Sequence, residues 1–172
     1  MTLTFNELAR ARYSCKSYSD HPLEEDKLAT ILEAGRLAPT AKNLQEQRIY
    51  VARTDEALAK IDEITRCRYG ATTVLVVAFD TANTFIYPGG QRDSGIEDAS
   101  IVATHMMLAA ASVGVNSCWI NLFDPAEAAR VLDLSENEEV LLLLDLGYAA
   151  EDAGPLPNHD KRKPLDETVT FL

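Results

Sequence analysis

Basic residues gather near both ends of this chain, although the chain as a whole is strongly acidic. Its 172 residues include 27 acidic and 16 basic side chains, a formal net charge of −11. Six of the 16 basic residues lie in two short segments, namely Arg10, Arg12 and Lys16 near the start and Lys161, Arg162 and Lys163 near the end. Guanidinium groups suit the oxygens of a phosphate. We therefore expect the two ends to converge on a small anion, the alternative being two solvated surface patches.

Several other kinds of site are excluded by missing motifs. The sequence has no glycine-rich phosphate loop of the form G-x-G-x-x-G or G-x-x-x-x-G-K-[ST], and no G-x-S-x-G or H-E-x-x-H. Its histidines and cysteines lack metal-ligand spacing, so no metal site is predicted; they are His21, His105, His159, Cys15, Cys67 and Cys118. We expect His105 to be a core or interface histidine and Cys15 to be a buried, inert thiol.

The overall composition limits the partners and the compartment. A net charge of −11 argues against nucleic acid and against an anionic membrane surface as partners. The first residues lack the apolar run of a secretory signal, and no stretch approaches the roughly 20 apolar residues of a membrane span. Three unpaired cysteines fit a reducing environment. We expect one cytoplasmic globular domain over residues 1–172.

Hydrophobic periodicity predicts alternating helices and strands that would position these charges. A helix follows the acidic turn at 24–26 and ends before Pro39, and a second opens at Asp55, which can cap its first turn. A third opens at Asp124-Pro125, with Asp124 as its N-cap, and runs to about Leu132. Apolar runs predict strands at 49–52, 74–79, 117–120 and 140–146, with 74–79 buried on both faces. Residues 96–113 form a helix that is apolar nearly all round, so it must be buried inside one subunit or between two.

Two segments lack the hydrophobic periodicity of a helix or a strand. The stretch 81–95 carries one proline and three glycines and is predicted to be a long loop, a class of segment that often carries function. The chain after Ala150 has three prolines and few core residues, so we expect it to cover another surface, such as that of a second subunit.

Three motifs, taken together, resemble those of one family. Residues 12–16, RYSCK, are similar to its R-x-S-x-[RK] element; residues 38–45, APTAKNLQ, to its A-P-[ST]-x-x-N-x-Q turn; and residues 162–167, RKPLDE, to its R-x-P-L-[DE]-E segment. The helix from Asp98, the strand at 117–120 and the G-Y-x-x-E-D segment at 147–152 fit between them in the same order. The family is the nitroreductase family of FMN-dependent oxidoreductases, and the resemblance runs from about Leu8 to Val169.

The resemblance implies a fold, an assembly and a cofactor. The fold would be α+β, with a mixed sheet flanked by helices. The family implies an intertwined homodimer that holds two tightly but non-covalently bound FMN molecules at its interface, with the C-terminal arm reaching the partner's sheet. NAD(P)H would be the co-substrate. FMN requires partners for its phosphate, its ribityl chain and the N1 and O2 edge of its ring.

Matched positions carry the implied roles onto this chain. Arg12 and Arg162 would bind the phosphate, Ser14 would donate to the phosphate or ribityl region, and Lys16 would lie near N1 and O2, where it stabilises the negative charge of the reduced flavin. The other cofactor-binding candidates are Tyr13, Pro39, Thr40, Ala41, Asn43, Gln45, Arg68, Ser117, Trp119 and Lys161. Of these, Thr40, Asn43 and Gln45 would come from the other subunit, Arg68 would reach the ribityl chain, and Lys161 would assist at the phosphate. For Trp119, the alternative to contacting the cofactor is a position in the hydrophobic core.

The implied reaction is a ping-pong transfer. NAD(P)H would pass a hydride to N5 of FMN, and the reduced flavin would then reduce a nitroaromatic, a quinone or a similar small acceptor. No protein nucleophile is required. Phe85, Tyr87 and Arg92 of the long loop are candidates for lining the acceptor pocket. The alternatives are a non-catalytic flavin-binding or sensing module and a flavoenzyme of the same fold with another reaction, such as a dehalogenase or an ene-reductase.

One departure from the family's pattern bears on the site. Glu46 follows Gln45 where many relatives have proline. We therefore expect a looser turn and an extra negative charge near the anionic cofactor, with an effect on substrate preference rather than on FMN binding.

Overall fold

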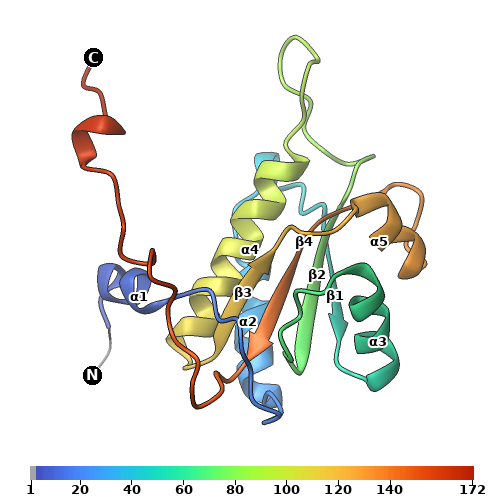
Figure 1. Ribbon diagram of the computed structural model, residues 1–172. Coiled ribbons are helices and arrows are strands. Elements are labelled where there is room, and N and C mark those ends of the chain that lie inside the picture. Colours follow the sequence, from blue (N-terminus) through green and yellow to red (C-terminus); the bar gives the residue numbers. More distant parts are fainter. Residues whose placement is uncertain (1–2) are drawn as a thin grey trace.

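The computed structural model describes residues 3–172 and contains helices on both sides of one sheet (Figure 1). The helices are α1 (Phe5–Ala11), α2 (Glu25–Arg36), α3 (Asp55–Ile64), α4 (Gly95–Ser112) and α5 (Pro125–Val131), with short 3₁₀ turns η1 (Ala41–Asn43) and η2 (Leu165–Glu167). The strands are β1 (Gln47–Ala52), β2 (Thr73–Asp80), β3 (Asn116–Ile120) and β4 (Glu138–Gly147). The predicted order of elements is confirmed, with boundaries that shift by one or two residues.

The sheet has the order β1-β2-β4-β3, and each neighbouring pair of strands is antiparallel. The predicted α+β class is confirmed. Within the described residues, the parallel pairing expected of a mixed sheet is limited to an isolated bridge between Ser14 and Ser117. That bridge places the segment around Ser14 beside the edge strand β3.

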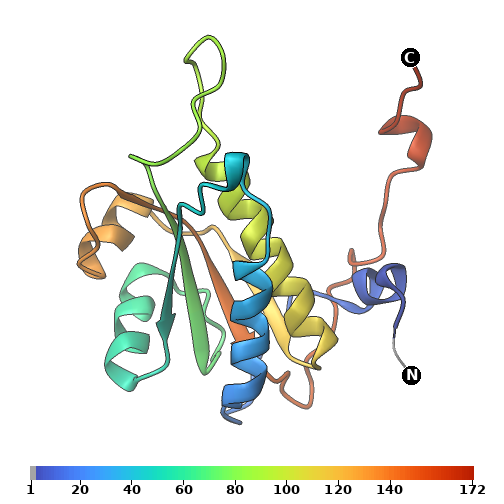
Figure 2. The same cartoon turned by 180° about the vertical axis from the view of Figure 1, so that it is seen from behind.

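The side chains of strand β2 pack against helices on both faces of the sheet. All eight of its residues are buried, as predicted from its continuous apolar run. Leu75, Val77 and Phe79 pack with α2 and α4, whereas Val74, Val76 and Ala78 pack in the core beside α3 and α5. Figure 2 shows α2 and α4 together on one face, with α3 on the other side of the strands.

Helix α4 is buried on one side only. On one side of the helix its residues Val102, Ala103 and Met106 are fully buried, whereas Ile96 on the opposite side is 57% exposed. His105 is also exposed, and its Nδ1 lies 2.8 Å from the carbonyl oxygen of Ile101 in its own helix. A core position for His105 is therefore wrong, because the sheet and α2 cover a single face, whereas the interface position given beside it stays a prediction. Part of the apolar surface of α4, including Ile96 and Ile101, therefore stays exposed in the single chain.

Local capping departs from the prediction in one place. The hydroxyl of Thr54, not the carboxylate of Asp55, accepts the capping hydrogen bond of α3 from Ala57 N. Asp124 caps α5 as predicted, because its carboxylate accepts from the backbone of Ala126 and Glu127 at 2.9 and 3.2 Å.

The segment predicted as a long loop folds back on itself. Ile86 and Asp93 form an antiparallel bridge, and Tyr87 N donates to the Arg92 carbonyl at 3.1 Å. Gly89 and Gly90 close the turn with φ of 95° and 66°, which glycine adopts without a steric cost. The segment projects beyond the N-terminal end of α4 (Figure 1).

The C-terminal tail leaves the body of the molecule. Residues after Ala150 pass α1 and then extend away from the sheet, as both views show. Leu165 is 77% exposed and Phe171 is 95% exposed, so these apolar side chains are largely uncovered by the described residues. The expectation that the tail covers a second subunit stays a prediction. No helix within residues 3–172 has the length and apolar character that crossing a membrane requires.

Candidate functional site

The segment 12–16 runs along the edge strand β3. Cys15 N donates to the Ser117 carbonyl at 3.0 Å, and the Cys15 side chain is fully buried, as predicted. Because side chains alternate along an extended segment, burying Cys15 leaves Ser14 and Lys16 on the accessible side. Lys16 is exposed, and its Nζ lies 5.8 Å from the centre of the Tyr69 ring.

The tail that contains Arg162 contacts the N-terminal segment through His159. His159 Nε2 lies 3.1 Å from the Arg10 carbonyl oxygen, and the His159 ring meets the Tyr13 ring edge-on at a centroid distance of 6.4 Å. Arg162 donates to the carbonyls of His159 and, at 2.8 Å, of Lys161. A cavity of about 300 Å³ is lined by Arg10, His159, Asp160 and Arg162. The two ends of the chain therefore do converge.

Four cations near the two ends form no ion pair within the described residues, although Asp160 also lines the cavity that holds Arg162. Among the described residues, Arg12, Lys16, Lys161 and Arg162 have no carboxylate oxygen within 4.0 Å. Lys42, Lys60, Arg66 and Arg92 are unpaired as well, whereas Arg53 and Arg68 each pair with a carboxylate. Free guanidinium and ammonium groups in so acidic a chain are a donor set that fits a phosphate. The chemistry of this edge thus fits the phosphate and the electron-accepting edge of FMN.

The turn at 40–45 is held in an unusual backbone conformation. Lys42, Asn43 and Gln45 have φ of 51°, 58° and 55°, in the left-handed region that non-glycine residues rarely adopt. Thr40 Oγ1 accepts from Gln45 N at 3.0 Å, and Ala41 N donates to Asp98 Oδ1 at 3.0 Å. Strain of this kind concentrates at ligand-binding sites. Pro39, as expected, lies just after α2 and begins this turn.

One chain does not bring the turn and the cationic edge together. Asp98, which holds the turn, is in the first turn of α4, whereas Arg12 lies in a small cavity with Ala111 and Gly114 at the other end of that helix. The 13 residues from Asp98 to Ala111 span about 20 Å at 1.5 Å per residue. The candidate site is therefore divided into two halves.

The three acceptor-pocket candidates lie beside the turn. The rings of Phe85 and Tyr87 are 5.3 Å apart, and the Arg92 guanidinium lies 4.2 Å from the Tyr87 centroid. Lys42 Nζ of the turn lies 4.6 Å from the Phe85 centroid. The folded loop and the turn therefore form one cluster of packed aromatic and cationic groups.

Other predicted residues have structural partners. Arg68 pairs with Asp62 at 2.6 Å and donates to the Ala71 carbonyl at 2.8 Å. Its guanidinium is therefore already hydrogen-bonded within the chain. The Ser117 side chain is buried. Trp119 packs against the core beside α4, and its Nε1 donates to Asn121 Oδ1 at 2.9 Å, which is the core position given as its alternative.

Sequence reasoning missed the residues that support the site. His159 fastens the tail and Tyr69 lies beneath Lys16, but neither belongs to a motif. Glu46, expected to place a charge near the cofactor, is instead only 1% exposed and faces the interior. The spacing of His159, three residues before Arg162, is the only sequence signal that could have indicated its role.

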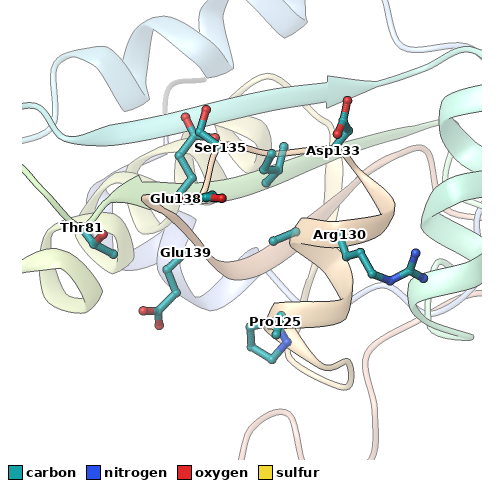
Figure 3. A pocket seen from close by; sticks show the side chains of 11 residues that line it. Thr81, Pro125, Arg130, Asp133, Ser135, Glu138 and Glu139 are labelled. Carbon is teal, nitrogen blue, oxygen red and sulfur yellow. The ribbon is translucent and has the colours of Figure 1, made fainter.

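Another cavity within the described chain does not suit FMN. It measures about 600 Å³ and lies between α5 and the start of β4 (Figure 3). Its charged lining comprises Arg130, Asp133, Glu136, Glu138 and Glu139. Arg130 is paired with Glu127, so the surplus of carboxylates would repel a phosphate. No group of three or more acidic, His or Cys side chains within 3–172 is arranged to hold a metal ion.

Comparison with known proteins agrees with the motifs and the fold. The model of the nitroreductase family matches residues 9–69 and 67–148. A nitroreductase family protein of Clostridium difficile 630 has 34% identity, with 98% of both chains covered and a TM-score of 0.92. An NADH dehydrogenase of Thermus thermophilus has 29% identity over 195 residues, covering 95% of this chain and 93% of the relative. A nitroreductase-fold structure from Exiguobacterium sibiricum, in complex with FMN, has a TM-score of 0.85 at 19% identity and shares the fold.

The chain therefore belongs to the nitroreductase family, a family of oxidoreductase enzymes.

Proposed function

We propose that this protein is an FMN-dependent NAD(P)H oxidoreductase that acts as a homodimer, with residues 1–172 forming one FMN-binding unit. The observation that carries the proposal is that Arg12 and Lys16 lie on the segment beside β3 and that the tail brings Arg162 to Arg10, next to that segment. The chain as a whole has a net charge of −11. The FMN complex of the structural neighbour and the NADH-linked name of the Thermus relative support the choice of cofactor and reductant.

The divided site supports the homodimer. The turn at 40–45 lies about 20 Å along α4 from Arg12, so a second chain is needed to place a turn beside each cationic edge. The exposed side of α4 and the exposed tail residues Leu165 and Phe171 offer apolar surface for such an interface.

The chain's own residues would bind and orient the cofactor. Arg12 and Arg162, with Lys161 nearby, would hold the phosphate; Ser14 would donate beside it; and the turn of the partner, with Asn43, would contact the ring. FMN, when bound, supplies the hydride chemistry between NAD(P)H and a small acceptor such as a nitroaromatic or a quinone. Phe85, Tyr87 and Arg92 would form the acceptor side of the site.

Absorption spectroscopy of the purified protein tests the proposal. We expect a flavin spectrum with one FMN per chain, bleaching under anaerobic NADH or NADPH, and recovery on addition of a quinone or a nitroaromatic. A flavin spectrum that neither nucleotide bleaches would contradict the enzyme and favour a flavin-binding module. Protein that neither contains nor takes up FMN would contradict both.

Replacing Lys16 is predicted to make the bound flavin harder to reduce. The Lys16 ammonium has no carboxylate partner among the described residues, so its charge is available to stabilise the reduced, anionic flavin. Lys16→Met should lower the two-electron potential by about 30 to 60 mV, which corresponds to about 1.4 to 2.8 kcal/mol. Lys16→Arg should retain most of the potential. Anaerobic dye-coupled titration measures it, and an unchanged potential in Lys16→Met would remove Lys16 from this role.

A further inference from the structure

Two buried carboxyl groups meet where the turn at 40–45 joins the rest of the protein. Glu46 follows the turn and is 1% exposed, while Asp98 in the first turn of α4 is 3% exposed. Asp98 Oδ1 accepts from Ala41 N at 3.0 Å, and Glu46 Oε1 accepts from the Ser94 hydroxyl at 3.2 Å. One oxygen of each carboxyl group is thus committed to a neighbouring segment.

The second oxygen of each group is buried without a partner. Glu46 Oε2 and Asp98 Oδ2 make no hydrogen bond to any part of the chain from residue 3 onward. Two buried, unpartnered carboxylate oxygens are costly, whereas a proton held between two such groups satisfies both at once. Burial first, and the neighbouring Asp98 second, raise the pKa of Glu46.

No described cation neutralises this pair. Arg48 reaches the backbone carbonyl of Glu46 at 3.3 Å, but its charge is directed to Asp80 at 3.3 Å and Glu138 at 3.8 Å. Lys42 lies over the Phe85 ring instead. The groups that face the Glu46 side chain are therefore Ser94 and Asp98 at the start of α4. The Arg48 guanidinium and Asp80 N contact only the backbone carbonyl of Glu46, at 3.3 and 2.9 Å.

We propose that Glu46 carries a proton and donates it to Asp98 Oδ2, and that this bond makes Glu46 a positioning residue for the turn at 40–45. Asp98, fixed in this way, holds Ala41 N. Ser94 extends the connection to the folded loop, because its hydroxyl also accepts from Phe85 N at 3.1 Å. One buried network thus fixes both the turn proposed to contact the flavin and the loop proposed to line the acceptor site. The proposed consequence for FMN binding rests on the proposed function.

Loss of this proton should loosen the turn. Two ionised carboxylates in one buried site repel each other, so deprotonation at alkaline pH favours separation of Glu46 from Asp98. The bond from Ala41 N to Asp98 is then weakened. Glu46→Gln keeps a donor toward Asp98 but cannot titrate, so it should hold the turn at every pH. Glu46→Ala removes the donor and should leave the turn loose at every pH.

Hydrogen exchange of the Ala41 amide in the flavin-free protein tests the pair directly. After correction for the intrinsic pH dependence of exchange, wild-type protection should fall by about tenfold between about pH 6 and about pH 9, which corresponds to 1.4 kcal/mol. Glu46→Gln should show no such fall, and Glu151→Gln, at an exposed glutamate, should behave as wild type. A fall of equal size in Glu46→Gln would overturn the proposal, and so would constant wild-type protection.

FMN titration at the same pH values tests the consequence. Wild-type affinity should fall in parallel with Ala41 protection, and Glu46→Gln affinity should not. If protection follows the proposal but FMN does not bind at any pH, the proposed function fails and the proton-sharing pair stands. If Glu46→Ala does not fold, the pH dependence of Ala41 protection in the wild type and in Glu46→Gln still tests the proposal.

Discussion

Arg12→Ala should weaken FMN binding by about 10- to 100-fold, because a charge-assisted hydrogen bond contributes about 1.5 to 3 kcal/mol. Arg162→Ala should have an effect of similar size, and the double variant should lose more than either. Arg12 has no carboxylate partner among the described residues, so its removal should leave the free energy of unfolding nearly unchanged. Fluorescence titration of FMN into flavin-free protein measures the affinities.

Riboflavin separates a phosphate contact from a general loss of the site. It lacks the phosphate, so Arg12→Ala should bind riboflavin as the wild type does. Arg12→Lys should recover part of the FMN affinity, since it keeps the charge and loses the planar fork. Lys163→Ala is the matched control, because Lys163 pairs with Glu167 at 3.5 Å and matches no cofactor-binding position of the family. Equal losses for riboflavin and FMN in Arg12→Ala would contradict the phosphate assignment.

The stability of the protein should decrease as pH rises from about 4 to about 8, because of Asp145. This residue lies on β4 opposite Cys118, is fully buried, and has neither carboxylate oxygen hydrogen-bonded within the described chain. Burial raises the pKa of Asp145 from 3.8 to about 8, against a smaller opposing effect of Arg68. The folded state therefore keeps a proton that the unfolded chain releases above its ordinary pKa. The stabilisation is complete below that pKa and is lost as pH rises toward 8.

Asp145→Asn should remove most of this dependence. A displacement of about four pKa units corresponds to at most about 5 kcal/mol at pH 8, so the variant should be several kcal/mol more stable than wild type there and close to it at pH 4. Urea unfolding over this range measures the difference. Asp152→Asn, at an exposed aspartate, is the control. If the free energies of unfolding of Asp145→Asn and of the wild type change with pH in parallel, Asp145 is not the source of the pH dependence.

Most of the fold could be predicted because its elements have strong local signals. The β2 run predicts a strand buried on both faces, and Asp124-Pro125 marks the start of α5. The exposed side of α4 could not be predicted, since its apolar residues are the same whether the sheet or a second chain covers them. The capping role of Thr54 was missed because Asp55, one residue later, is an equally good cap by type.

The candidate site could be predicted only as far as its motifs extend. Arg12, Lys16 and Arg162 follow from ordered motifs, and the structure brings their segments together. The burial of Glu46 could not be predicted, because a sequence does not show which way a side chain points, and here Asp98, 52 positions later, meets it in the interior. The role of His159 depends likewise on a contact with Arg10, far away in the chain.

Mixed dimers test most directly whether two chains share each flavin site. Arg12→Ala/Arg162→Ala removes the cationic half, and Asn43→Gly removes the side-chain amide of the turn while keeping its left-handed backbone. Differently tagged chains, one of each variant, are co-expressed, isolated as the mixed species and titrated with FMN. We predict one site of wild-type affinity per mixed dimer, since one site then receives both intact halves. Two equally weakened sites, or a protein that remains a monomer, would contradict the account.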